Sequence, residues 1–286
     1  MTAQTTPTAD CWPEDVQRAL LIGRLWQPGV GPTLAAASPE GLHDLSALAP
    51  TSSALLELPD VATRVRAHLA SGQAAHLGSA QAAIANSDEA VRDNRQPWLL
   101  APCDLQAVKA SGVTFVASML ERVIEEQAKG DAARAQAIRE KLAPVLGDSL
   151  RGLVAGSEQA AKVKVLLQDM GLWSQYLEVG IGPDAEIFTK AQPMSSVTCG
   201  DTVGIHPISQ WNNPEPEIVL AVRSDGKIIG ATLGNDVNLR DVEGRSALLL
   251  GKAKDNNASC SIGPFVRLFH GGFTMDELRK VRVSLL

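Results

Sequence analysis

The sequence predicts an α+β fold in which a mostly β region of short strands follows inserted helices and a small mixed N-terminal region. Three observations carry this prediction. Residues 19–46 alternate short apolar runs with Pro and Gly, residues 53–85 and 117–171 have the apolar spacing of helices, and from residue 177 the apolar runs are short and strand-like.

The N-terminal region is expected to hold a few strands joined by Pro/Gly turns over residues 19–46, then helices over residues 53–85. The polar segment ANSDEAVRDNRQPW separates this region from the rest of the chain. Because domain boundaries fall in polar linkers, we place a boundary near residue 97. It divides a small α/β domain (1–97) from a larger domain (98–286).

The second region starts as an apolar, strand-like stretch and then turns helical, since the apolar residues between 117 and 124 recur at helical spacing. A further helix is expected between Ser157 as N-cap and Gly171 as C-terminal stop. Strands are then predicted in YLEVGIG, AEIFTK, EIVLAV and KIIGATLGNDV.

Composition excludes several classes of protein. The formal charge of −6 and the lack of a dense Lys/Arg patch argue against nucleic acid or an anionic membrane as the partner. No apolar run approaches 18 residues and no signal peptide is evident, so we expect a soluble cytoplasmic protein. The 4 cysteines are scattered, which suits reduced thiols better than a disulfide framework or a zinc site.

The stretch WNNPEPEIVLAV places Glu215 and Glu217 at alternate positions of a predicted strand. This strand runs into Asp225-Gly226, which is a strong signal for a two-residue hairpin loop. With that loop, Ser224 opposes Lys227, Glu215 opposes Asp236, and Glu217 opposes Gly234 on the same face. Like charges this close are destabilising, so the three carboxylates require a compensating cation.

Oxygen ligands without His or thiolate nearby in the sequence favour Mg²⁺, Mn²⁺ or Ca²⁺, with Mg²⁺ preferred because it takes few carboxylates and keeps positions for water or substrate. The alternative is a solvated acidic edge, since Pro216 is typical of an edge strand. The polar run GNDVNLRDVEGRS, flanked by apolar residues, favours the functional interpretation because burying such groups is costly.

These motifs resemble the fumarylacetoacetate hydrolase family, and within it the dehydratases of 2-keto-3-deoxy sugar acids. The resemblance rests on NNPEPEIVL, GNDVNLRD, AKDNNASCSIGP and AEIFTK, and it runs from about residue 15 to the end. It implies a β-roll catalytic domain, a homodimer, and a divalent metal, usually Mg²⁺, held by Glu215, Glu217 and Asp236. The family lysines correspond to Lys254 and Lys190.

One departure from the family pattern concerns the chemistry. Hydrolytic members activate water with a His-Glu pair, and the His position is Ser118 in this chain, while Glu121 is retained. Hydrolysis of a C–C bond therefore lacks its usual general base. Elimination of water needs no attacking water.

The resemblance thus implies Mg²⁺-dependent dehydration of a 2-keto-3-deoxy pentonate to 2,5-dioxopentanoate through a metal-stabilised enolate, in sugar-acid catabolism. We expect Lys254 to polarise the substrate or transfer a proton, provided burial lowers its pKa. Glu121 is the expected general acid or base at the leaving hydroxyl, and Ser118 is expected to form a hydrogen bond with the oxygen of that hydroxyl. Lys190 and Arg240 are the candidates for holding the substrate carboxylate, and the alternative for each is a structural role as a paired cation.

Two alternatives stay open: a metal-dependent hydrolase of 1,3-dicarbonyl compounds, and a catalytically silent member of the family. The chain stops at KVRVSLL, which is predicted to be a strand, whereas members of the family continue. We therefore expect the C-terminal part of the β-roll to be missing.

Overall fold

The computed structural model describes residues 11–112, 124, 133, 136–140, 153–173 and 175–284. The chain divides into two compact units: unit 1 comprises Met1–Val108 and Thr189–Leu286, and unit 2 comprises Lys109–Phe188. The boundary predicted near residue 97 falls inside unit 1, because strands from both sides of that residue share one sheet.

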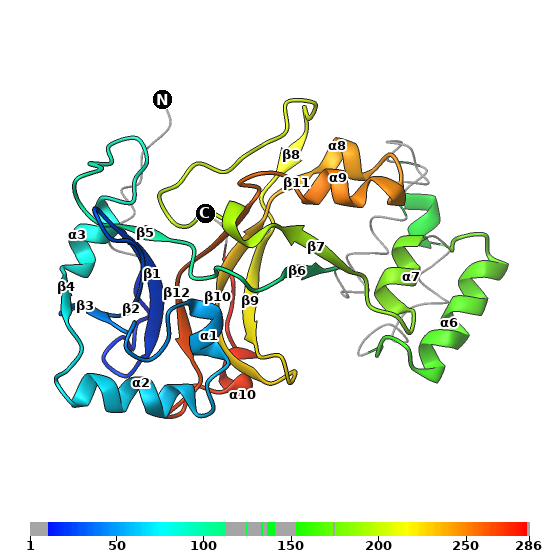
Figure 1. Cartoon of the computed structure of the whole chain (residues 1–286). Coiled ribbons are helices and arrows are strands. Elements are labelled where there is room, and N and C mark those ends of the chain that lie inside the picture. Colours follow the sequence, from blue (N-terminus) through cyan, green and yellow to red (C-terminus); the bar gives the residue numbers. More distant parts are fainter. Residues whose placement is uncertain are drawn as a thin grey trace. The chain divides into compact units, whose positions relative to one another are not determined.

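Unit 1 is built on an eight-stranded sheet with the order β4-β3-β2-β1-β12-β10-β9, and β5 also pairs with β1. Figure 1 shows β1, β12, β10 and β9 side by side. Its strands are β1 (Leu21–Gln27), β2 (Gly31–Ser38), β3 (Gly41–Asp44), β4 (His76–Gly78), β5 (Trp98–Leu100), β9 (Pro216–Val222), β10 (Ile228–Asp236) and β12 (Cys260–Leu268). This sheet with its helices confirms the predicted α+β, mostly β class.

Both faces of the sheet are covered near β1 and β2, which explains their almost continuous apolar sequence. Ile22 and Leu34 pack on one face with apolar residues of the segment 55–65, whereas Leu21 and Leu25 pack on the other with the segment 80–84. The alternation along each strand sends successive side chains to opposite clusters.

The predicted helical region 53–85 forms three helices, α1 (Ser52–Leu56), α2 (Val61–Ala70) and α3 (Ala80–Ala85), interrupted by β4. Thr51 caps α1 by accepting a hydrogen bond from the amide of Ala54 at 3.1 Å, and Ser79 caps α3 in the same way. Short polar residues before apolar runs thus start these helices.

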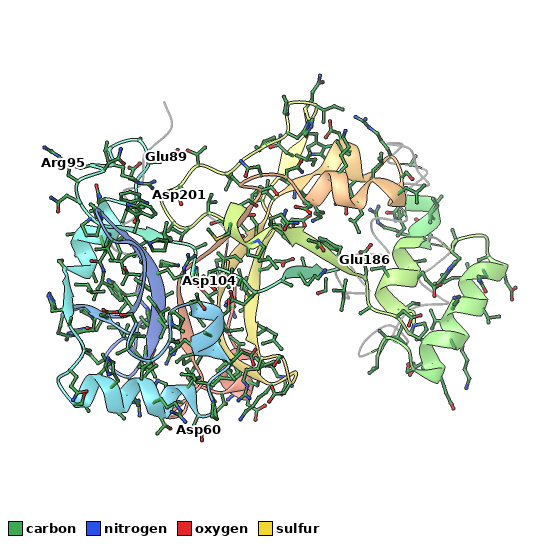
Figure 2. All side chains as sticks on the ribbon, in the orientation of Figure 1. Asp60, Glu89, Arg95, Asp104, Glu186 and Asp201 are labelled. Carbon is green, nitrogen blue, oxygen red and sulfur yellow. The ribbon has the colours of Figure 1, made fainter. Side chains whose placement is uncertain are left out.

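Asp104 holds α1 from a distant segment of unit 1 (Figure 2). Its buried carboxylate accepts hydrogen bonds from the amides of Ser52 at 2.6 Å and Ser53 at 3.0 Å, and Nε of Arg24 lies 3.6 Å away. Charge-assisted bonds of this kind bind two of the amides that the start of a helix leaves without intrahelical partners.

Short elements surround the ends of β9 and β10. They are β8 (Asn212–Asn213), which pairs with β11 (Asn238–Leu239), then α8 (Arg240–Glu243), η3 (Ala247–Leu249) and α9 (Leu250–Lys254), with η2 (Pro193–Ser195) and α10 (Met275–Leu278) elsewhere in the unit. The predicted C-terminal strand is wrong for residues 281–284, which lie outside any helix or strand.

Unit 2 contains α6 (Glu158–Asp169) and α7 (Gln175–Ile181), and β6 (Val108–Ser111) pairs with β7 (Ile187–Ala191) where the chain passes between the units. The predicted Ser157 cap of α6 is confirmed, because its hydroxyl accepts from the amide of Ala160 at 3.1 Å. The strand predicted in YLEVGIG is wrong. It lies largely in α7, whose Leu177 and Ile181, one helical turn apart, pack against α6.

No helix among the described residues is long and apolar enough to span a membrane.

Candidate metal centre

The hairpin of β9 and β10 positions the acidic residues as the sequence predicts. Glu217 pairs with Gly234, and the amide of Asp236 donates to the carbonyl of Glu215 at 2.9 Å. The end of β10 that carries Asp236 leads into β11 and α8 (Figure 1), and Lys254 at the end of α9 donates to Asp236.

The loop of this hairpin differs from the prediction, and a bulge cancels the difference. The amide of Arg223 donates to the carbonyl of Lys227 at 2.9 Å, so the loop has three residues and ends on Gly226 with a φ of 83°. A three-residue loop with a left-handed glycine is a standard hairpin form. A bulge between Ile228 and Gly230 then inserts one residue in β10 and restores the predicted register beyond it.

Glu215, Glu217 and Asp236 form the acidic cluster. One carboxylate oxygen from each lies within 4.8 Å of the other two. Asp236 is 4% exposed and the two glutamates are half-buried. Among the described residues, this is the group of acidic, His or Cys side chains that could hold a metal ion, and it offers oxygen ligands alone.

Lys254 bridges two members of the acidic cluster. Its buried Nζ donates to Oε2 of Glu215 and, at 2.9 Å, to Oδ2 of Asp236. Burial alone would lower the pKa of Lys254, but the charges of Asp236 and Glu215 outweigh it and raise that pKa. The direction of this shift, for the carboxylates alone, is opposite to the lowering expected for Lys254 beside a bound metal, and it favours the ammonium form.

Lys190 is 2% exposed and lies behind Asp236. It donates to the carbonyl of Val237 at 3.1 Å, to Oγ of Ser259 at 3.1 Å, and to the carbonyl of Lys254. These three bonds use all three ammonium hydrogens. The geometry thus favours a structural task for Lys190 over the predicted binding of substrate.

Arg240 begins α8 and pairs with Glu243, with Nη1 3.1 Å from Oε2. Its side chain is 25% exposed, and its positive charge contributes to lowering the pKa of Glu215. Arg240 therefore lies close enough to the acidic cluster to influence the ionisation of Glu215.

Ser118 and Glu121 lie outside the described residues, so their predicted roles stay predictions.

The acidic cluster fits a divalent cation. Burial, followed by the charge of Asp236, raises the pKa of Glu217 to about 7, and burial also raises the pKa of Asp236. Nζ of Lys190 lies 3.2 Å from buried Oδ1 of Asp236, whereas the carboxylate of Glu217 has no hydrogen-bond donor among the described residues. Three carboxylates face two lysine ammonium groups, so added positive charge stabilises the site.

Two asparagines that the sequence interpretation did not single out hold Glu215. Oδ1 of Asn235 accepts from the amide of Glu215 at 3.0 Å, and Nδ2 of Asn238 donates to Oε1 of Glu215 at 3.0 Å. The only signal for them in the sequence is their place in the polar run GNDVNLRD.

Two curated proteins resemble part of this chain. A probable 2-keto-3-deoxyxylonate dehydratase of Haloferax volcanii is 41% identical over 110 residues, which cover 38% of this chain and 36% of that protein. A 2-dehydro-3-deoxy-D-arabinonate dehydratase of Saccharolobus solfataricus is 36% identical over 94 residues, 33% of this chain and 30% of that protein. The matches thus span about a third of these relatives, and they confirm the predicted similarity to sugar-acid dehydratases.

Solved structures show the fold. A 2-keto-3-deoxy-D-arabinonate dehydratase complexed with magnesium and 2,5-dioxopentanoate superposes with a TM-score of 0.52 at 19% identity, over 86% of this chain and 66% of that one. Its apo form gives a TM-score of 0.53 at 18% identity, over 87% and 66%. The chain shares the fold of these dehydratases. No family model matches the sequence.

Proposed function

We propose that this chain binds Mg²⁺ through Glu215, Glu217 and Asp236 and dehydrates a 2-keto-3-deoxy pentonate to 2,5-dioxopentanoate. The observation that carries the proposal is the acidic cluster, built by the register of β9 and β10 at the buried end of a hairpin. Its oxygen ligands suit Mg²⁺, with Mn²⁺ or Ca²⁺ as substitutes. The dehydratases that the chain resembles support this substrate class.

A bound Mg²⁺ supplies Lewis-acid polarisation of the 2-keto group. Lys254, held as an ammonium beside the acidic cluster, can donate a hydrogen bond or a proton to an oxygen of the substrate. We therefore assign Lys254 the role of an electrophilic group that polarises the substrate, and not the role of a general base. Arg240 keeps its proposed task of binding the substrate carboxylate, whereas Lys190 fixes Asp236 and the backbone around it.

Removal of the C3 proton and protonation of the leaving C4 hydroxyl require a further acid–base group. We assign that work to Glu121, with Ser118 hydrogen-bonding the leaving oxygen. Because loss of one water from the pentonate gives 2,5-dioxopentanoate, no oxidant or second substrate is needed. A cytoplasmic location, a homodimeric assembly and the absence of a nucleic-acid partner are parts of the same proposal.

Proton NMR of 2-keto-3-deoxy-D-pentonate tests the activity. We expect metal-stripped protein to leave the spectrum unchanged, and added Mg²⁺ to remove the C4 methine signal and produce the aldehyde or its hydrate. The E217Q variant with Mg²⁺ is the control that lacks one carboxylate, and it should give the unchanged spectrum.

Full turnover in excess EDTA would contradict the metal requirement. Cleavage of an acylpyruvate with no dehydration would instead establish the hydrolase alternative, which uses the same carboxylates. Mg²⁺ binding without turnover of either substrate would identify a catalytically silent member.

A further inference from the structure

Asn238 is fully buried and uses its amide group as a double donor. Its Nδ2 donates to Oε1 of Glu215 at 3.0 Å and to Oε2 of Glu243 at 2.6 Å. Carboxylates only accept, so the two neighbours fix which end of the amide carries the hydrogens. Oδ1 of Asn238 is left buried without a donor among the described residues, although such burial is costly.

This amide completes the support of one member of the acidic cluster. Oε2 of Glu215 faces Lys254, and Oε1 faces Asn238, so both carboxylate oxygens have a donor. The backbone of Glu215 is held as well, by Asn235 and Asp236. The carboxylate of Glu215 is therefore held in one orientation from two sides.

Both side chains that donate to Glu215, Asn238 and Lys254, are next in sequence to residues of one small apolar cluster. Leu239 and Val242 are buried against Ala253, and these three residues flank Asn238, Glu243 and Lys254 along the chain. Glu243 is also tied to Arg240 at 3.1 Å. The packing of α8 and α9 around β11 thus determines where the two donors meet Glu215.

We propose that Asn238 is a positioning residue of the metal centre, which orients the carboxylate of Glu215 for a divalent ion and keeps it apart from Glu243. A neutral amide suits this task. An aspartate there would repel both glutamates, and a lysine would neutralise the negative charge that attracts the metal. This inference rests on the proposed metal site.

The test compares metal affinities of Asn238→Leu with those of the wild type, by calorimetric titration of chelator-treated full-length protein with Mg²⁺ and separately with Ca²⁺. Leucine has a similar volume but donates nothing. Mg²⁺ demands near-octahedral geometry, whereas Ca²⁺ tolerates irregular ligands. We expect Mg²⁺ affinity to fall about 10- to 100-fold and Ca²⁺ affinity to fall clearly less.

Asn86→Leu is the matched control, because the Asn86 amide also makes structural hydrogen bonds, to the carbonyls of Asp93, Gln96 and Pro97, in a loop between α3 and β5. It should lower stability and leave both metal affinities unchanged. Circular dichroism of each variant at the titration temperature confirms that it is folded, and Asn238→Ala replaces the leucine variant if that one does not fold.

Unchanged Mg²⁺ affinity in the Asn238 variant, or an equal loss for Mg²⁺ and Ca²⁺, would overturn the positioning role. Failure of the wild type to bind either ion would instead overturn the proposed metal site. Wild-type binding without dehydration would contradict the proposed activity alone, since the affinity comparison is still measurable.

Discussion

Glu215, directly before β9, and Glu217, within β9, bring their carboxylates into the same cluster, yet their environments are opposite. Glu215 is hydrogen-bonded on both oxygens, and although burial would raise its pKa, the charge and hydrogen bond of Lys254 with the Asn238 bond outweigh burial and lower it. Glu217 has no such partner among the described residues, and its pKa is raised to about 7. The ionised form of Glu217 therefore destabilises the fold until a cation binds.

We predict that Glu217→Gln raises the stability of the metal-free protein while it removes metal binding. At pH 8, loss of the buried charge should add about 1–3 kcal/mol to the free energy of unfolding, and Mg²⁺ affinity should fall at least about 100-fold. Urea unfolding in EDTA and calorimetric titration measure the two effects. Glu215→Gln is the contrast, because it removes the negative charge that pairs with Lys254 and leaves one acceptor oxygen for the two donors Lys254 and Asn238, so it should lower stability; a stabilised Glu215→Gln would contradict this distinction.

We predict that Lys190→Met strongly destabilises the protein. The change leaves two carbonyls and a hydroxyl without their donor and one side of Asp236 without its counter-charge, at a cost of about 3–5 kcal/mol. Chemical denaturation measures it. Lys227→Met, at an exposed position directly after the hairpin loop, should change stability by less than about 0.5 kcal/mol. A well-folded Lys190→Met with weakened substrate binding would restore Lys190 as a substrate ligand.

At the scale of elements, the start of α1 depends on a single charge from another segment. Burial would raise the pKa of Asp104, but hydrogen bonds from Ser53, Ser52 and Leu105 outweigh burial and lower it from 3.8. A lowered carboxyl pKa adds stability that is present above the unfolded value and is lost as the pH falls through the folded value.

We therefore predict that Asp104→Asn lowers the free energy of unfolding by about 2 kcal/mol at pH 7, and that its difference from the wild type narrows below about pH 4. Urea unfolding at pH 7, 5 and 3.5 measures the difference in the free energy of unfolding between the variant and the wild type. Asp276→Asn, whose side chain is 81% exposed, serves as the control. A difference that stays constant down to pH 3.5 would show that the charge of Asp104 is not what holds α1.

The sequence was informative where patterns are local. The strands of the β9–β10 hairpin, the Ser157 cap and the opposition of Glu217 to Gly234 follow from periodicity and capping chemistry. The length of the hairpin loop could not be predicted in this way. A three-residue loop followed by a bulge gives the same strand pairing, farther along β9 and β10, as the predicted two-residue loop. The helix α7 was mistaken for a strand, since a short apolar run fits both periods until its packing against α6 is known.

The support of the site was less predictable for a physical reason. Lys190 donates to acceptors that lie 47 to 69 residues away in the sequence. The role of Asn238 depends on its hydrogen bond to Glu215, 23 residues earlier. Such contacts depend on how the sheet is assembled, which composition and spacing do not reveal. Hence the sequence predicts the acidic cluster correctly. For Lys190 it predicts binding of substrate, whereas the hydrogen bonds of Lys190 favour a structural role.

At the scale of the whole molecule, the acidic cluster and the helices α6 and α7 belong to different compact units. All three carboxylates belong to unit 1. We predict that Mg²⁺ at about 100 times its Kd slows hydrogen exchange up to about 100-fold in β9, β10 and α9, and leaves α6 and α7 unchanged. Mass spectrometry of peptic peptides measures this. Equal protection in both units would show that they unfold together.

Acylating reagents modify an amine only when they reach its nitrogen. Lys227 and Lys252 are exposed and should react with acetic anhydride at once, whereas Lys190 should stay unmodified while the sheet is intact. The fraction of molecules acetylated at Lys190 would therefore measure the fraction in which the sheet has unfolded. This lysine can thus report how much of a preparation is folded.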